Sequence, residues 1–222
     1  MTVLCFGQDF RPRQFRHGPW ISYQHPHRAS LVLALFTNFE AMASSKETKT
    51  FIVAVIGVGL VGSEFVDQLL SLGLPSVKLV YLSASEYSVF IPDGLDPSED
   101  WRKALSSSRS TSDPEELIEM IKANFSPSKT KAIIVDNTSS EFIANFYPDF
   151  LKEGFHVITP NKKAFSSSQS LYDDIIATSK SGGARFLNES TVGAGLPVIS
   201  TLKDLINTGD EVSIIGCCCK NG

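Results

Sequence analysis

The stretch FIVAVIGVGLVG, residues 51–62, constrains the fold of this chain more than any other feature. Its first six residues are apolar and mostly β-branched, which is typical of a strand buried on both faces. The strand leads into Gly57, Gly59 and Gly62 in a G-x-G-x-x-G pattern, and residues 63–72 follow with apolar side chains at helical spacing. In this order the glycines permit a tight turn, a close approach of backbone N–H groups to a pyrophosphate, and close helix packing. The pattern predicts a dinucleotide-binding strand–turn–helix unit.

Size and charge narrow the class of protein further. The chain has 222 residues, 42% of them hydrophobic, and a net charge of −4. These values suit one large domain, or one domain plus a fragment, with a real core, and they give no general attraction for nucleic acid or membrane. The apolar run at 31–36 is far shorter than the roughly 18 residues that span a bilayer. Residues 6–216 contain no cysteine, which fits a reducing compartment, and we expect a cytoplasmic location.

Residues 1–46 differ from the rest of the chain. They hold four arginines and three of the four histidines, and prolines interrupt them without any apolar periodicity. We expect a poorly structured N-terminal extension, for which three interpretations compete. It could be a mitochondrial presequence, a metal-binding segment through His25 and His27, or an upstream extension before a second start at Met42. We favour the last and exclude the segment from the fold.

Alternating apolar segments after residue 62 predict the remaining architecture. Residues 88–112 are rich in serine, proline and aspartate, and we expect a peripheral insertion with a short helix at 101–105. The expected strands lie at 77–82, 131–135, 155–159 and 184–188, and the expected helices at 113–125, 141–151 and 171–179. Strands that alternate with helices predict an α/β fold with a Rossmann-like, doubly wound and mostly parallel sheet. We place this domain at residues 47–196.

The tip of the second strand bears on the choice of cofactor. An acid there favours NAD, and a basic neighbour favours NADP. The tip is Ser83-Ala84-Ser85-Glu86-Tyr87, in which the acid lies beyond the expected place and no arginine is adjacent. The choice between NAD and NADP stays open.

Polar residues follow the later strands, at the edge of a parallel sheet where ligands bind. Residues 136–140 and 160–165 occupy such places, although the same side chains also suit helix caps and a solvated lysine pair. Gly193 and Gly195 free the backbone, so that carbonyl groups could turn toward a cation or a ligand beside Glu189. A glycine-rich start to the next helix explains the same pattern equally well.

Four motifs of this chain resemble homoserine dehydrogenase, most closely the fungal enzymes. In order they are GVGLVG (57–62), VDNTSS (135–140), TPNKKAFSS (159–167) and ESTVGAGLPVISTLKDLINTGDEV (189–212). The resemblance implies an NAD(P)-binding domain joined to a substrate and dimerisation domain, in a homodimer. It also implies NADP- or NAD-dependent interconversion of L-aspartate 4-semialdehyde and L-homoserine, in threonine and methionine biosynthesis.

The resemblance assigns residues to two sites. The implied cofactor contacts are Gly57, Val58, Gly59, Leu60, Val61, Gly62, Thr138, Ser139, Thr159, Asn161 and Lys162. The implied site for a sodium-like monovalent cation uses Glu189 with the backbone carbonyls of Val192, Ala194 and Leu196. Tyr87 stands where relatives carry an arginine, which leaves a preference for NADP undecided.

The match ends near residue 212, before the substrate-binding acids and the catalytic lysine of the family. The sequence continues instead as SIIGCCCKNG. We therefore expect residues 197–222 to be only the start of the second domain, no catalytic residue within this chain, and little or no turnover by it alone. The alternative is a non-catalytic NADP-binding fragment. A short-chain dehydrogenase is disfavoured because no Tyr-x-x-x-Lys pair occurs.

Overall fold

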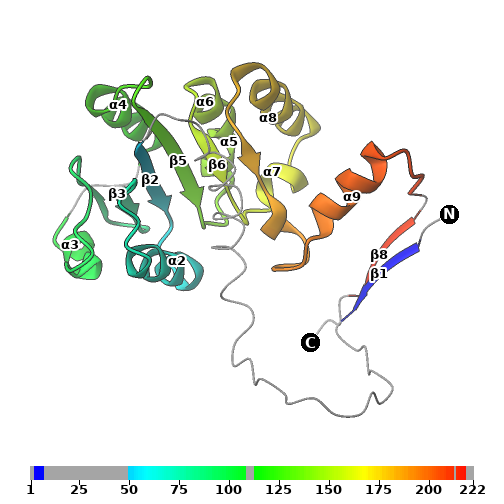
Figure 1. The fold of residues 1–222 in the computed structure, drawn as a ribbon, viewed down its shortest axis with the longest axis horizontal. Helices are drawn as coiled ribbons and strands as arrows, with labels where there is room; N and C mark the ends of the chain where they lie inside the picture. Colours follow the sequence, from blue (N-terminus) through cyan, green and yellow to red (C-terminus); the bar gives the residue numbers. More distant parts are fainter. Residues whose placement is uncertain (1–2, 8–49, 109–112, 213, 219–222) are drawn as a thin grey trace, which may run out of the picture.

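A six-stranded, mostly parallel sheet with helices on both faces forms the body of the molecule (Figure 1). The computed structural model describes residues 3–7, 50–108, 113–212 and 214–218. The strands are β1 (Val3–Gly7), β2 (Thr50–Ile56), β3 (Val77–Ser83), β4 (Ser88–Phe90), β5 (Thr130–Asp136), β6 (His156–Ile158), β7 (Phe186–Leu187) and β8 (Ile214–Cys218). The helices are α2 (Leu60–Ser71), α3 (Trp101–Ser106), α4 (Pro114–Asn124), α5 (Glu141–Asn145), α6 (Tyr147–Lys152), α7 (Lys163–Ser166), α8 (Gln169–Gly182), α9 (Val198–Asn207) and the 3₁₀ helix η1 (Glu189–Thr191).

The strand order is β4-β3-β2-β5-β6-β7, in which β4 alone runs antiparallel to its neighbour. From β2 the chain crosses to β3 on one side and later to β5 on the other. The carboxyl ends of β2 and β5 therefore form the switch point at which ligands bind in doubly wound folds. The predicted Rossmann-like fold class is confirmed.

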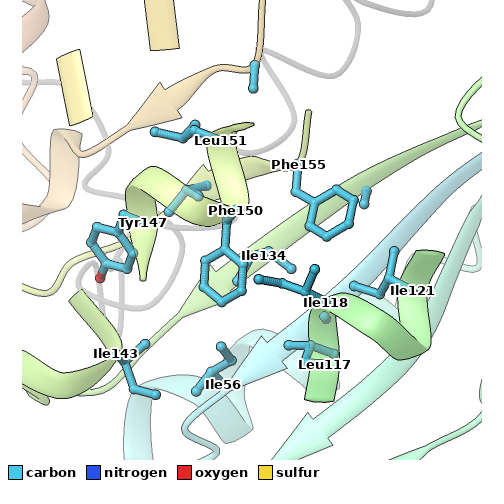
Figure 2. Packing of buried hydrophobic residues seen from close by; sticks show 14 of the residues in the cluster. Ile56, Leu117, Ile118, Ile121, Ile134, Ile143, Tyr147, Phe150, Leu151 and Phe155 are labelled. Atoms are coloured by element: carbon cyan, nitrogen blue, oxygen red, sulfur yellow. The ribbon is translucent and has the colours of Figure 1, made fainter. Parts of the chain in front are cut away.

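The core has two halves, one on each face of the sheet. Every second residue of β2 from Ile52 joins the cluster under α4, α5, α6 and α8, while every second residue from Phe51 joins the cluster under α2 and α3. Figure 2 shows the first cluster, in which Ile134 of β5 lies close to Phe150 of α6 and Ile118 of α4. Burial of both faces explains why these strands are continuously apolar.

A bulge in β3 sets the level at which this strand ends. Val53 pairs with Leu79, but the next residue, Ala54, pairs with Tyr81, so that Val80 is an extra residue in the ladder. The bulge brings Ser83 level with Ile56 at the carboxyl edge of the sheet. A β-bulge next to a ligand-binding edge commonly re-aims the residues that follow it.

Residues 88–112 are more than the predicted peripheral insertion. The helix expected near Trp101 is present as α3, but the segment also supplies β4, which closes the edge of the sheet beside β3. Leu95, Trp101 and Leu105 are buried in the cluster shared with α2. Because β4 has only three residues, its sequence is too short to show the alternation of apolar and polar side chains that predicts a strand.

A separate two-stranded parallel sheet joins β1 to β8. The predicted N-terminal extension therefore contains one strand, and the segment 197–222 contains α9 and β8. The histidine pair and the second start at Met42 lie outside the described residues, and the division into domains stays a prediction. Within the ranges that the structure describes, no helix is long and apolar enough to cross a bilayer.

His156 of β6 is a buried, neutral histidine. Its Nδ1 accepts the backbone N–H of Arg185 at 2.9 Å, and 7% of the residue is exposed. Burial, together with smaller contributions from the nearby charges of Lys131 and Arg185, lowers the pKa of His156 to about 4. The side chain thus belongs to the core edge and folds in its uncharged form.

The stability of the protein should depend on pH through His156. Between about pH 6.5 and about pH 4 the unfolded chain binds a proton that the folded chain excludes, so stability falls as the pH falls. The full loss is at most about 3 kcal/mol. This loss is measured by urea unfolding of the parent and of His156→Asn at pH 7 and pH 5. The amide oxygen of the asparagine can still accept the backbone N–H of Arg185. A parent and variant that lose equal stability between pH 7 and pH 5 would contradict the assignment.

Candidate dinucleotide-binding site

The turn after β2 is held in a conformation that favours glycine. Gly57 has a φ of +88°. The N–H groups of Gly57 and Val58 both donate to the carbonyl of Ser83, at 2.9 and 3.0 Å. A Cβ at Gly57 would also lie 2.6 Å from Cγ2 of Thr138. The turn is therefore tied to the end of β3 and packed against the loop after β5, as the predicted tight turn requires.

The other two glycines of the motif have different surroundings. A Cβ on Gly62 would lie 2.0 Å from the carbonyl oxygen of Gly57, so no side chain fits there. A Cβ on Gly59 would meet nothing within 4 Å. Gly62 thus brings α2 close to the turn, whereas Gly59 faces open space through which a ligand can approach the backbone.

The N-terminus of α2 has no side-chain cap. Its N-cap residue is Gly59, and its first turn contains no acid. Leu60 and Val61 are 95% and 53% exposed. By contrast, an aspartate or serine side chain accepts a backbone N–H at the start of α3, α4, α5 and α8. Among the described residues, the first N–H groups of α2 consequently have no side-chain cap, and the helix dipole favours an anion beside them.

A buried carboxylate organises the loop after β5. Asp136, the last residue of β5, has no exposed surface. Its Oδ1 accepts the N–H of Thr138 at 2.8 Å, and its Oδ2 accepts the Nδ2–H of Asn161 at 3.1 Å and the hydroxyl of Tyr147. Burial, followed by the charge of Asp136, raises the pKa of Tyr147 well above its usual range, so the phenol stays protonated and donates.

The hydrogen bonds around Asp136 also hold the loop after β6. The hydroxyl of Thr159 donates to the carbonyl of Asp136 at 2.9 Å and accepts the N–H of Asn161 at 2.8 Å. Nδ2 of Asn161 also donates to the carbonyl of Ser140, and its Oδ1 accepts the N–H of Lys163. The two polar loops predicted at the ligand-binding edge are therefore joined into one structure.

The predicted cofactor residues after β5 and β6 divide into two groups. Ser139 and Lys162 are exposed and Thr138 is half-buried at the carboxyl edge of the sheet. Thr159 and Asn161 are only 1% and 2% exposed, and their polar side chains bond within the protein. The second pair supports the loops, and a direct contact of these five residues with a cofactor stays a prediction.

Asn137 is a further candidate for a contact with the cofactor, although its sequence position alone did not single it out. Both polar atoms of its side chain are buried, and neither has a partner among the described residues. Its Nδ2 would lie 3.4 Å from a Cβ on Gly62, so the amide is beside the glycine turn. Its position within the polar residues that follow β5 could have indicated Asn137 as a residue of the site.

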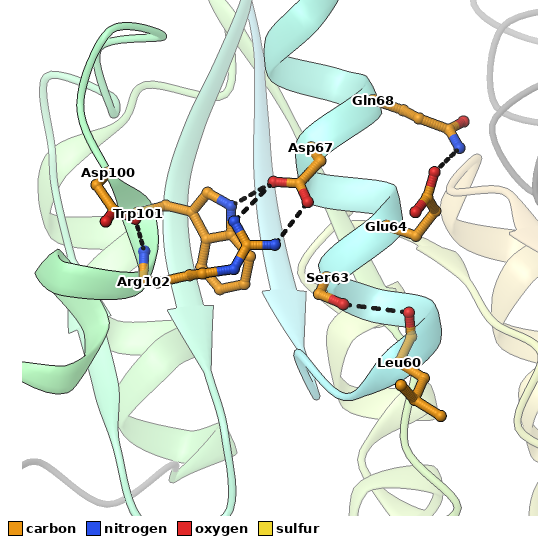
Figure 3. A network of polar contacts seen from close by, with 8 residues as sticks. All are labelled: Leu60, Ser63, Glu64, Asp67, Gln68, Asp100, Trp101 and Arg102. Carbon is orange, nitrogen blue, oxygen red and sulfur yellow. Dashed lines mark hydrogen bonds and ion pairs between the residues drawn. The ribbon is translucent and has the colours of Figure 1, made fainter.

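A cavity of about 320 Å³ lies beside the glycine turn and the end of β3. It is lined by Val58, Ser63, Ala84, Tyr87, Trp101, Arg102, Leu105 and Ser106. The sequence showed no arginine adjacent to the tip of the second strand, but the fold brings Arg102 there from α3. Figure 3 shows this arginine between Trp101 and Asp67 of α2. Packing of α3 against α2 places it, and no local pattern indicates that contact.

The predicted cation site combines a helix cap with an unusual loop. Glu189 accepts the N–H groups of Ile199 and Ser200, at 2.9 and 3.0 Å, and so caps α9. Ala194 has a φ of +52°, a left-handed conformation rare for a residue with a Cβ. Within the described part of the chain, no group of three or more His, Cys, Asp or Glu side chains could hold a metal. A cation would depend on backbone oxygens, and this site stays a prediction.

A family model described as the NAD binding domain of homoserine dehydrogenase matches residues 57–189, more than half of the chain. The chain belongs to the homoserine dehydrogenase family. The homoserine dehydrogenase of Emericella nidulans is 44% identical over 168 residues, which cover 73% of this chain and 45% of that protein. The Saccharomyces cerevisiae enzyme is 43% identical over 172 residues, which cover 76% and 46%. The chain thus spans less than half the length of these relatives.

Solved structures agree with the family assignment. A Candida auris protein of unknown function is 41% identical with a TM-score of 0.65, covering 74% of this chain and 45% of that one. A hyperthermophilic archaeal homoserine dehydrogenase in complex with NADPH is 26% identical with a TM-score of 0.53, covering 69% and 48%. The predicted resemblance to fungal homoserine dehydrogenases, an oxidoreductase family of amino-acid biosynthesis, is confirmed. The matching family model is that of an NAD binding domain, which supports the predicted NAD(P) class of cofactor.

Alanine at Gly59 and at Gly62 should have opposite consequences. Gly59→Ala should fold like the parent, because its Cβ meets no atom, but lower the affinity for NADP about tenfold or more by narrowing the approach to the N–H groups. Gly62→Ala should lose about 2 kcal/mol or more of stability through overpacking against Gly57. Urea unfolding and calorimetric titration measure both effects. Parent-like affinity in Gly59→Ala would refute the proposed approach of the ligand.

Proposed function

We propose that this chain binds NADP or NAD at the carboxyl ends of β2 and β5, with the diphosphate against the glycine turn. The observation that carries the proposal is the uncapped N-terminus of α2 beside Gly59, where no Cβ would obstruct an approaching phosphate. The N–H groups and dipole of a helix N-terminus are a general anion-binding device. Membership of a family with an NAD-binding domain supports the same placement.

The nicotinamide half would lie toward the loops after β5 and β6. Thr138, Ser139 and Lys162 are the residues that we assign to it, because the sheet edge presents them next to the switch point. Thr159 and Asn161 would act through the Asp136 network, which holds these loops in place. A bonded, buried scaffold of this kind keeps contact groups oriented before a ligand arrives.

The reaction that we propose for the protein is that of homoserine dehydrogenase. The bound dinucleotide would supply hydride chemistry at C4 of its nicotinamide, exchanging hydride with the aldehyde carbon of aspartate semialdehyde to give homoserine. We assign no described residue to the proton transfer, and the catalytic lysine of the family is expected outside residues 1–222. A homodimer and a cytoplasmic location are further proposals that rest on the resemblance.

A sodium-like cation would bind beside Glu189. One carboxylate and the carbonyl oxygens of Val192, Ala194 and Leu196 form an all-oxygen set, which suits a hard cation. The left-handed conformation of Ala194 supports the proposal, because it turns the carbonyls of this loop out of a regular pattern. Such a cation would stabilise the connection between η1 and α9.

A non-catalytic, dinucleotide-binding chain is the second candidate. It requires only the dinucleotide site at the glycine turn and the uncapped start of α2. It shares the cofactor site with the first candidate and differs only in turnover.

Titration and turnover of the 222-residue chain separate these candidates. We expect calorimetry to show one dinucleotide site per chain. We expect homoserine oxidation, followed at 340 nm, to be at least about 100-fold slower than in a whole fungal relative, because the proton-transfer lysine of the family is not expected among these 222 residues. Absence of binding to NADP and NAD would contradict the proposed cofactor site. Turnover near that of the relative would contradict the expected position of the catalytic lysine.

A further inference from the structure

Arg102 brings a positive charge to the part of the site that receives the adenosine ribose. In dinucleotide-binding folds that ribose lies at the tip of the strand after the first helix, which here is β3. Ala84, Tyr87 and Arg102 all line the cavity at this tip. A cation beside the ribose is the feature that lets such a site accept a 2′-phosphate.

Asp67 of α2 holds this arginine in a fixed geometry. Its Oδ2 accepts from one terminal guanidinium nitrogen at 2.6 Å, and its Oδ1 accepts from the other at 3.1 Å (Figure 3). Nε1 of Trp101 donates to the same Oδ1 at 2.7 Å, and the guanidinium of Arg102 lies 4.2 Å from the centre of the Trp101 ring. The guanidinium is therefore oriented at the rim of the cavity rather than free in solvent.

The pair leaves Arg102 able to accept a second anion. A guanidinium has five N–H donors, of which Asp67 uses two. The side chains of Arg102 and Asp67 are 56% and 43% exposed, so an incoming phosphate can reach them. The hydrogen bond from Arg102 holds the pKa of Asp67 below its usual value, so Asp67 is charged at neutral pH and repels a phosphate.

We propose that Asp67 and Arg102 together determine which dinucleotide this site prefers. Arg102 binds the 2′-phosphate of NADP, and the negative charge of Asp67 weakens that binding so that NAD, which carries a 2′-hydroxyl, also remains a ligand. The inference rests on the proposed dinucleotide function and deepens it. It explains how the chain can lack an arginine at Tyr87 and still accept NADP.

Two substitutions test the pair in opposite directions. Asp67→Asn keeps an acceptor for Trp101 but removes the charge, and should raise the affinity for NADP about fivefold relative to NAD. Arg102→Met keeps the length over the Trp101 ring but removes the cation. It should lower the affinity for NADP about tenfold or more and leave NAD within about twofold. Arg102→Lys should fall between the parent and Arg102→Met, because the charge remains without the planar fork.

The measurement is the ratio of the dissociation constants of NADP and NAD, obtained by calorimetry for each variant. Trp101 fluorescence in a Trp20→Phe background, in which it is the one remaining tryptophan, reports binding at this cavity directly. Asp149→Asn is the matched control: Asp149 bonds to Lys152 at 3.0 Å with similar exposure on α6, and its loss should leave the ratio unchanged.

Three further outcomes decide against the inference. Equal changes in NADP and NAD affinity would show that the pair only docks α3 on α2. An unchanged ratio in both Asp67→Asn and Arg102→Met, with parent-like thermal unfolding, would place the 2′ position elsewhere. Failure of the unaltered chain to bind either dinucleotide would refute the proposed function itself, and the inference with it.

Discussion

The contact between Gly62 and the carbonyl of Gly57 is the constraint on which the rest of the site depends. A Cβ on residue 62 would lie 2.0 Å from the carbonyl oxygen of Gly57. The helix α2 can therefore begin this close to the turn only if residue 62 has no side chain. That closeness places the N-terminus of α2 at the carboxyl edge of the sheet, where β2 and β5 end side by side. The turn is held from the other side by Ser83, whose level the bulge at Val80 sets. The proposed anion site is thus built from backbone geometry rather than from charged side chains.

A buried carboxylate stabilises the other half of the site. Asp136 is fully buried, and the groups around it are N–H and O–H donors of Thr138, Tyr147 and Asn161. Burying such a group is unfavourable unless donors satisfy it, so the network is strongly selective for one loop arrangement. It couples the end of β5 to the end of β6, which are the places where the nicotinamide would be received. Loss of one donor should therefore disturb both loops together.

The features that the sequence predicted well are local ones. The glycine motif, the buried strands β2, β3 and β5 and the capped start of α4 each follow from neighbouring residues, and the structure confirms them. The features that it missed depend on packing between distant segments. Arg102 reaches the cavity because α3 docks on α2, and Tyr147 reaches Asp136 from a different helix. Only the tertiary structure reveals that the buried side chains of Thr159 and Asn161 bond to the loops after β5 and β6. Their predicted contact with the cofactor stays a prediction.

We propose that the backbone N–H groups at the start of α2, directly after the glycine turn, receive the diphosphate of the cofactor. A titration of ¹⁵N-labelled chain with NADPH, followed by the amide chemical shifts, tests it most directly. We expect the largest shifts on the amides of residues 58–61 and smaller ones at Ala84 and Thr138. ADP should reproduce the shifts at 58–61. Largest shifts on α4 or α8, on the opposite face of the sheet, with unchanged amides at 58–61 would contradict it.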